Sequence, residues 1–249
     1  MTETTWREAL SASPLSWPIA GAASRLPTGQ GVPAVEAIDL ALGPLAGLRF
    51  VPPTPRPRGR RAKVPPDALY DARIARCSEV PTRPGNLHDL MNALVWSRFP
   101  LAKRAVHARQ DRLVRARVDP SGRRVVPHRT AEEDALAMLD EGGLVLLVLP
   151  PAADRVREAT LRRDVWALEQ AASSQQLLGA LFGHALYEHL ARREGRTVWG
   201  KAVLFPTPDL DVSLCDVDAW LAGCLETGPV PGEDCGSAPV VPSVLRSRR

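Results

Sequence analysis

The stretch GNLHDLMNALVWSRFP, residues 85–100, combines a strongly apolar helix pattern with three polar side chains. Its apolar residues recur at steps of three and four and predict one buried helix face, made of Leu87, Leu90, Met91, Leu94 and Val95. His88 and Asn92 are four residues apart and lie beside that face, while Asp89 projects about 100° further round the helix. We therefore expect a core helix over residues 87–97 that carries polar groups at its edge.

The three polar residues fit two different roles. An imidazole beside a carboxylate and an amide can act as a general base or bind a metal, since all three groups offer lone pairs. Asn86, His88 and Asp89 also lie where a helix N-terminus needs acceptors for its free N–H groups and favours negative charge. The residue types alone favour capping and structural hydrogen bonds.

A second polar pair occurs in LFGHALYEHL, residues 181–190, which we expect inside a long helix over residues 173–194. His184 and Glu188 are four residues apart, so both side chains stand on the same side of that helix. They could share one metal ion or one proton. A single pair of this kind is weak evidence for a metal site, because the familiar two-histidine helix motif supplies more ligands.

The rest of the chain predicts one helix-rich α+β domain with a few short strands. It has 249 residues, of which 45% are hydrophobic, and its strand-like runs lie at residues 47–51, 144–149 and 198–205. A further helix should begin at Pro100, and others are expected near residues 35–42, 67–77, 130–140, 152–158, 162–170 and 211–226. Six prolines lie between Pro52 and Pro66, a density that no regular helix or central strand tolerates. We expect an irregular, Pro/Arg-rich N-terminal arm over residues 1–66, a globular domain over 67–227 and an irregular basic tail over 228–249.

The net charge of +4 is mildly basic, and much of it follows directly on the first polar cluster. The basic residues there are Arg98, Lys103, Arg104, Arg109, Arg112, Arg115, Arg117, Arg123 and Arg124. This Arg98–Arg124 basic face could bind a phosphate-bearing or acidic ligand, and Lys103 could point toward His88. The alternative is a solvated surface, because no aromatic residues alternate with the basic ones to stack nucleic-acid bases. The sequence gives no indication of an oligomeric state.

The cysteine pattern and the apolar runs predict a soluble, cytoplasmic protein. The four cysteines have no close paired spacing, which indicates reduced thiols rather than a disulfide framework or a zinc knuckle. The N-terminal residues lack the basic start and unbroken apolar centre of a signal peptide. The longest strongly apolar run, residues 144–149, is too short to cross a bilayer, so we expect no membrane partner.

The run EVPTRPGNLHDLMNALVWSRFPLAK, residues 79–103, resembles the proteobacterial family known as domain of unknown function 3025. The matching positions are Pro81, Thr82, Arg83, His88, Asp89, Asn92, Ala93, Trp96, Phe99, Pro100 and Lys103. Three later blocks resemble family segments in the same order: RTAEEDALAMLDEGG at 129–143, LFGHALYEHL, and GKAVLF at 200–205. The resemblance covers roughly residues 67–227 and implies no established reaction. It marks the polar residues of both clusters, which indicates that they converge on one polar site.

Two functions stay open at this point. In the first, the chain is a metal-assisted hydrolase acting on a phosphate-containing or nucleic-acid substrate, with catalytic residues among His88, Asp89, Asn92 and Lys103. The cofactor would be a divalent metal, with His88, His184 and Glu188 as candidate ligands. In the second, the chain is a noncatalytic interaction protein and the same cluster is a structural hydrogen-bond network. The enzyme hypothesis fails if His88 and His184 lie on opposite sides of the fold, or if the cluster is sealed from solvent.

Overall fold

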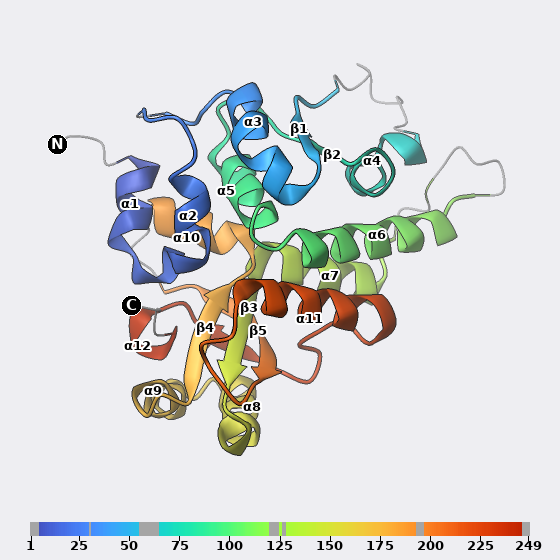
Figure 1. Ribbon diagram of the computed structural model, residues 1–249. Coiled ribbons are helices and arrows are strands. Elements are labelled where there is room, and N and C mark those ends of the chain that lie inside the picture. Colours follow the sequence, from blue (N-terminus) through green and yellow to red (C-terminus); the bar gives the residue numbers. More distant parts are fainter. Residues whose placement is uncertain are drawn as a thin grey trace.

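The computed structural model describes residues 5–29, 31–54, 65–119, 125, 128–192 and 197–245. These residues form a helix-rich α+β domain around a four-stranded sheet with the order β4-β3-β5-β6 (Figure 1). The strands are β3 (Gly143–Val148), β4 (Leu177–Leu181), β5 (Trp199–Pro206) and β6 (Ser237–Pro239). The central strand β3 pairs antiparallel with β4 and parallel with β5, and β5 pairs antiparallel with β6. Every residue of β3 and β4 is buried, as expected for strands covered on both faces.

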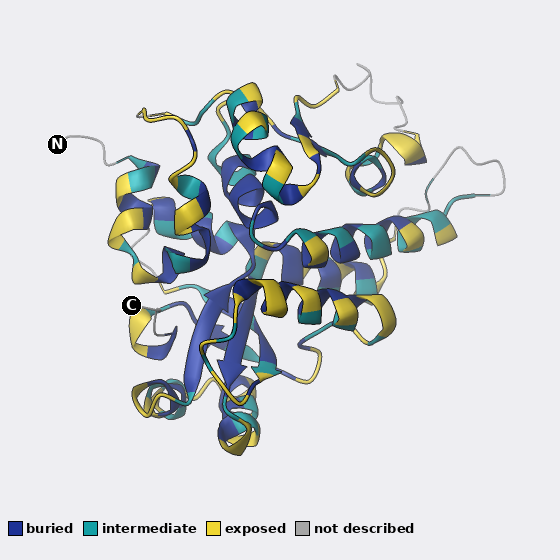
Figure 2. Cartoon of the chain, in the orientation of Figure 1, coloured by how far each residue is buried: buried dark blue, intermediate teal, exposed yellow. Residues whose placement is uncertain are grey.

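The helices of the central region lie close to their predicted positions. They are α4 (Tyr70–Cys77), α5 (Leu87–Trp96), α6 (Pro100–Ala116), α7 (Ala131–Gly142), α8 (Ala153–Arg162) and α11 (Leu214–Thr227). The apolar face of α5 is buried in the core, and Figure 2 shows this helix largely in the colour of buried residues. The side chain of Asn86 caps α5 by accepting the N–H of Asp89 at 3.0 Å. None of the helices in the described ranges is both long enough and apolar enough to cross a membrane.

The prediction of one long helix over residues 173–194 is wrong. The chain instead forms the end of α9 (Val165–Ser173), then strand β4, then α10 (His184–Arg192). Residues 193 and 194 lie outside the described part of the chain. Gln175 adopts a left-handed φ of 56°, which directs the chain out of the helix, and the apolar run that follows pairs with β3. A short apolar run fits a buried strand as well as a buried helix, so periodicity alone could not separate them.

The N-terminal residues contain the helix and the strand predicted near residues 35–42 and 47–51, and they also form helices before residue 33, where the sequence predicts irregular structure. Three helices occur there, α1 (Trp6–Ala12), α2 (Trp17–Ala23) and α3 (Val35–Ala46), followed by β1 (Arg49–Val51), which pairs in parallel with β2 (Glu79–Pro81). The side chains of Trp6, Ile19, Ile38 and Leu42 are buried in the main core. The indole N–H of Trp17 donates to the carbonyl of Gly179 in β4 at 3.1 Å. Burial of these apolar side chains explains the order of this segment, although residues 55–64 of the predicted arm lie outside the described ranges.

The C-terminal residues also differ from the irregular tail that the sequence predicts. Strand β6 extends the central sheet, and a short helix, α12 (Pro242–Leu245), follows it. Val244 and Leu245 are fully buried, and Leu245 lies against Gly179, where an added Cβ would come within 2.8 Å of its side chain. Residues 246–249 lie outside the described part of the chain. The ordered part of this segment therefore helps to cover the outer strand β4.

Candidate metal site

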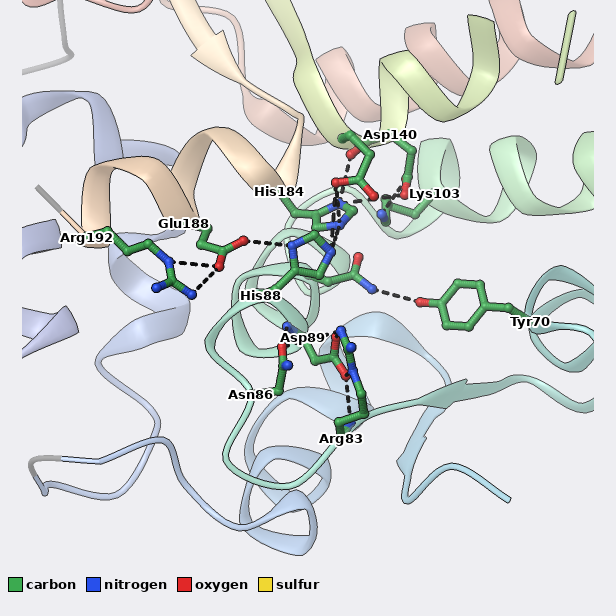
Figure 3. Close-up of polar contacts among 12 residues, drawn as sticks. Tyr70, Arg83, Asn86, His88, Asp89, Lys103, Asp140, His184, Glu188 and Arg192 are labelled. Atoms are coloured by element: carbon green, nitrogen blue, oxygen red, sulfur yellow. Dashed lines mark hydrogen bonds and ion pairs between the residues drawn. The ribbon is translucent and has the colours of Figure 1, made fainter. Parts of the chain in front are cut away.

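Two histidines and a glutamate from three different helices converge at one point. Figure 3 shows the two histidines, His88 and His184, side by side. His88 lies in the first turn of α5, His184 begins α10, and Glu141 lies at the end of α7. The Nε2 atoms of the two histidines are 3.0 Å apart. The Oε2 atom of Glu141 is 3.3 Å from Nε2 of His184 and 3.8 Å from Nε2 of His88. The structure thus brings together the two histidines that the sequence singled out and adds a carboxylate that it did not.

Gly183 allows these segments to approach so closely. A Cβ atom at this position would lie 2.5 Å from the carbonyl oxygen of Glu141 and from the amide nitrogens of Gly142 and Gly143. The amides of Phe182 and Gly183 donate to the carbonyl of Gly143 at 3.0 and 2.8 Å. Only glycine fits this contact, so it places His184 directly against the end of α7.

Both imidazole rings are held by their Nδ1 atoms. Nδ1 of His88 lies 2.8 Å from Oε2 of Glu188, and Nδ1 of His184 lies 2.8 Å from the backbone carbonyl oxygen of Asp140. A carboxylate and a carbonyl can only accept, so each Nδ1 carries the hydrogen. In neutral rings the two Nε2 lone pairs then face each other, an arrangement that needs a cation or a proton between them. Metal-binding histidines show the same pattern, with the second nitrogen tied to a carboxylate or a carbonyl.

The charges around the rings keep the donors in a state that suits a cation. Burial, together with the nearby charge of Lys103, lowers the pKa of His184 to about 3, so this ring is neutral at physiological pH. Burial disfavours ionisation of Glu188, but hydrogen bonds from Arg192 and His88 outweigh it and lower the pKa of this carboxyl. Burial raises the pKa of Glu141, which a bound cation would reverse.

The cluster opens onto a cavity of about 310 Å³. Its lining residues are Pro53, Tyr70, Pro81, Arg83, His88, Asp89, Asn92, Asp140, Glu141 and His184. The side chain of His88 is 30% exposed and that of Glu141 is 50% exposed, whereas His184 is buried. The two histidines therefore meet at a place that solvent reaches, and neither condition that would exclude an enzyme is met.

Asp89 and Glu188 contact other side chains rather than the point where the three ligands converge. Both carboxylate oxygens of Asp89 accept from the guanidinium of Arg83, at 2.9 and 2.7 Å, and one also accepts the Arg83 backbone N–H at 2.6 Å. Asp89 thus fixes the turn before α5. Glu188 accepts a hydrogen bond from Nδ1 of His88 and another from Arg192 at 2.7 Å. In this geometry Glu188 orients His88, and Glu141 occupies the position expected for the carboxylate ligand.

Asn92 and Lys103 have different surroundings. The amide Nδ2 of Asn92 donates to the hydroxyl of Tyr70 at 2.8 Å, and its Oδ1 is buried with no partner among the described residues. Lys103 is fully buried, is absent from the cavity lining, and forms an ion pair with Asp140. Burial opposes ionisation of Asp140, yet the charge of Lys103 lowers the pKa of that carboxyl well below its usual range. Lys103 therefore supports the residue that holds His184.

Sequence reasoning missed Glu141, Asp140 and Tyr70. Asp140 and Glu141 belong to DEGG, residues 140–143, where an acidic pair ends a helix directly before a buried strand. Both lie in the block RTAEEDALAMLDEGG, residues 129–143, which resembles a family segment, and that resemblance is the signal that could have indicated them. Tyr70 begins α4 and had no signal in its own segment, because its contact with Asn92 joins two separate helices.

Most described members of the Arg98–Arg124 basic face make contacts within the protein. Arg98 donates to the carbonyl of Pro18 at 3.0 Å, and Arg104 donates to that of Gly47. The others with such contacts are Lys103 with Asp140, Arg109 with Glu132, Arg115 with Asp111 and Arg117 with Glu133. Arg123 and Arg124 lie outside the described residues. Most of these side chains are therefore engaged by carboxylates or carbonyls of the chain itself, and binding of a phosphate-bearing or acidic ligand there stays a prediction.

Two imidazole nitrogens and one carboxylate oxygen form a donor set that suits Zn²⁺ or Fe²⁺ and leaves coordination positions for other ligands. No curated protein and no solved structure matches the chain. The model of one family, described as a protein of unknown function (DUF3025), matches residues 59–231, a range that includes His88, Glu141 and His184. The chain belongs to this DUF3025 family.

Proposed function

We propose that the protein is a metal-assisted hydrolase that acts on a phosphate-containing or nucleic-acid substrate, with His88, His184 and Glu141 holding a divalent cation. The observation that carries this proposal is the facing pair of Nε2 atoms, 3.0 Å apart, whose partner Nδ1 atoms are both tied to acceptors. Two neutral imidazoles with neither a cation nor a proton between them would oppose their lone pairs. A cation of ordinary ligand distance removes that opposition and makes use of Glu141 as well.

The surrounding residues support a hydrolytic role for such a cation. A divalent metal with three protein ligands can bind a water molecule, lower its pKa and polarise a phosphoryl oxygen. Glu188 and the carbonyl of Asp140 orient the two rings, and Gly183 fixes the distance between α10 and α7. The cavity of about 310 Å³ is at the small end of ligand sites, which favours one small reacting group inside it.

The phosphate part of the proposal rests on Arg83. This is the cationic side chain among the cavity-lining residues, and it stands 58% exposed. Its Nε and Nη2 atoms bind Asp89, whereas Nη1 has no hydrogen-bond partner among the described residues. A guanidinium with free N–H groups beside a metal site suits a phosphoryl oxygen.

A structural hydrogen-bond network in a noncatalytic interaction protein is the second candidate. The contacts of Lys103 with Asp140 and of Asp89 with Arg83 favour it, because they occupy two of the predicted catalytic residues. The same network does not account for Glu141, which is half exposed and lies near two ring nitrogens without a hydrogen bond to either. A metal ion bound by His88, His184 and Glu141 accounts for the positions of all three side chains.

Metal content and hydrolysis test the proposal together. Protein purified without chelator is analysed for bound metals and assayed with a chromogenic phosphodiester and phosphomonoester, beside the double variant His88→Ala/His184→Ala. A second double variant, His128→Ala/His189→Ala, removes the same number of histidines, neither of them a proposed ligand, and serves as the matched control. We expect about one equivalent of Zn²⁺ or Fe²⁺ in wild type and control, and metal-dependent hydrolysis that the His88/His184 variant lacks.

Two outcomes contradict the proposal at different levels. Equal and negligible metal in all three proteins, with no uptake of added Zn²⁺, Fe²⁺ or Co²⁺, removes the metal site. Metal bound through His88 and His184 without hydrolysis of either ester removes the phosphate hydrolase and leaves a metal-binding protein.

A further inference from the structure

Tyr70 turns its polar end into the molecule. It lies at the rim of the cavity, where 37% of the residue is exposed. A tyrosine near a surface usually buries its ring and points its hydroxyl toward water. The hydroxyl of Tyr70 instead contacts Asn92, which is only 7% exposed, and Figure 3 shows it directed toward the side of the site where His88 lies. This inverted orientation needs a partner for the hydroxyl inside the cavity.

The contact with Asn92 leaves the hydroxyl hydrogen of Tyr70 free. Nδ2 of Asn92 donates to the Tyr70 oxygen at 2.8 Å, and an amide NH₂ group offers no lone pair in return. Among the described residues no acceptor is found for the Tyr70 hydrogen. Burial and the carboxylate of Asp140 raise the pKa of Tyr70 well above its ordinary value, so the group stays a hydrogen-bond donor.

The other end of the same amide is also unsatisfied. Oδ1 of Asn92 is buried and has no hydrogen-bond partner among the described residues. Buried polar atoms of this kind are rare in folded proteins and indicate a water molecule, an ion or a ligand. The cavity wall next to the metal ligands therefore holds one free donor, on Tyr70, and one free acceptor, on Asn92. His88 lies one helical turn before Asn92 on α5, which keeps this wall beside the metal site.

We propose that Tyr70 is a catalytic residue whose hydroxyl donates a hydrogen bond to an anionic oxygen of the metal-bound substrate, and that Asn92 is the positioning residue that aims it. This inference rests on the proposed function, because the substrate oxygen must be brought there by the cation. In the proposed chemistry the acceptor is a nonbridging phosphoryl oxygen, whose negative charge grows as water adds to phosphorus. The ester P–O bond then breaks, and the departing alcohol takes up the proton that the water loses. A fixed donor at such an oxygen accelerates a reaction by about 100-fold to 1,000-fold.

Inorganic phosphate is a direct probe of this subsite. Wild-type protein loaded with Co²⁺ is titrated with phosphate, and the visible absorption of Co²⁺ reports both metal binding and the arrival of the anion. Tyr70→Phe keeps the ring and its edge-on contact with His107 at 5.5 Å between centroids, and removes only the hydroxyl. We expect unchanged Co²⁺ affinity and phosphate affinity about tenfold weaker or more, with kcat for phosphodiester hydrolysis lower by about 100-fold.

Tyr187→Phe is the matched control, since Tyr187 is the second of the two tyrosines in the chain. Its hydroxyl donates to the carbonyl of Leu181 at 2.8 Å and does not line the cavity. This variant should bind phosphate as wild type does. Asn92→Ala should weaken phosphate binding less than Tyr70→Phe does. The double variant should bind phosphate no more weakly than Tyr70→Phe alone, because both changes act on the same hydrogen bond, from the Tyr70 hydroxyl to phosphate.

The outcomes separate this inference from the proposed function. Phosphate affinity in Tyr70→Phe equal to wild type, with Co²⁺ bound normally, overturns the inference and leaves the metal site intact. Wild-type Co²⁺ protein that binds no phosphate at millimolar concentration does the same. Failure of the wild-type protein to bind Co²⁺ overturns the proposed function, and the inference falls with it.

Discussion

His88 and His107 each have a carboxylate at the same distance from Nδ1, but the surroundings of their Nε2 atoms differ. Nδ1 of His88 lies 2.8 Å from Glu188, and Nδ1 of His107 lies 2.8 Å from Asp71. Nε2 of His88 faces the ring of His184 at the edge of a cavity. His107 is only 2% exposed, stacks on the indole of Trp96, and has no hydrogen-bond partner for its Nε2 among the described residues.

The difference shows that a carboxylate on one histidine nitrogen does not by itself indicate a metal site. What distinguishes His88 is a second imidazole and a carboxylate at its other nitrogen, together with access from solvent. His107 has no second imidazole at its Nε2: its ring face stacks on Trp96, and the Asp140 carboxylate lies 3.8 Å from that nitrogen and is paired with Lys103. We call His88, His184 and Glu141 the open cluster, and His107 with Asp71 and Trp96 the closed cluster. The Lys103–Asp140 pair lies between these two clusters.

Removal of the buried ammonium of Lys103 should have the largest effect on the stability of the protein. Lys103→Met leaves the carboxylate of Asp140 buried without its cation, and we expect a loss of about 3–5 kcal/mol in the free energy of unfolding, measured with urea. The double variant Lys103→Met/Asp140→Asn removes both charges and should recover part of that loss. His184 contacts the backbone oxygen of Asp140, so this double change retains the support of that ring. A loss under about 1 kcal/mol in Lys103→Met would contradict the role assigned to the pair.

Removal of the Glu188 charge should weaken the open cluster without unfolding it. Glu188→Gln removes the carboxylate that orients His88, and changes of this kind cost about 10-fold to 100-fold in metal affinity. The free energy of unfolding of the metal-free protein should change little, because Glu188 lies near the surface beside Arg192. Co²⁺ titration followed by absorption measures the affinity, and an unchanged value would show that the contact does not prepare His88 for a metal.

Sequence patterns located the helix that carries His88 and two strands of the central sheet, but not the start of the helix that carries His184. The predicted helix over 87–97 is observed as α5, Leu87–Trp96, and the predicted start of the next helix at Pro100 is observed as well. The strand-like runs at 144–149 and 198–205 appear as β3 and β5 within one residue. Strong apolar periodicity, the Asn86 cap and the proline at the first helical position are local signals, so they survive folding unchanged.

Contacts between distant segments lay beyond such signals. The meeting of His184 with Glu141 depends on a close approach that Gly183 permits, and nothing in either segment alone specifies it. The turn to strand β4 depends on pairing with β3, which competes with the helical pattern of the same residues. Lys103 illustrates the same limit, because a lysine in a basic run reads as a surface charge until the carboxylate of Asp140 is placed beside it.

The pH dependence of stability should reveal the neutral ring of the open cluster. In the metal-free protein, burial lowers the pKa of His184 to about 3, whereas an unfolded histidine titrates near 6.5. Between these values the unfolded chain binds a proton that the native protein does not, so stability falls as the pH drops below 6.5. We expect a loss of about 1 kcal/mol between pH 6.5 and 5.5 from this group. His184→Asn should lack that part of the pH dependence in urea unfolding, and equal slopes in the two proteins would refute the assignment.

The smallest expected effect concerns the closed cluster and completes the comparison. Asp71→Asn keeps a hydrogen-bond acceptor for Nδ1 of His107 but removes the charge. The free energy of unfolding should therefore fall by about 1 kcal/mol at most. Co²⁺ affinity should equal that of wild type, in contrast to Glu188→Gln, although both changes replace the carboxylate on a histidine Nδ1 at 2.8 Å. A fall in Co²⁺ affinity similar to that of Glu188→Gln would mean that Asp140 couples the two clusters, because its carboxylate lies 3.8 Å from His107 and 3.6 Å from His184. The metal site would then include His107 and Asp71 as part of its support.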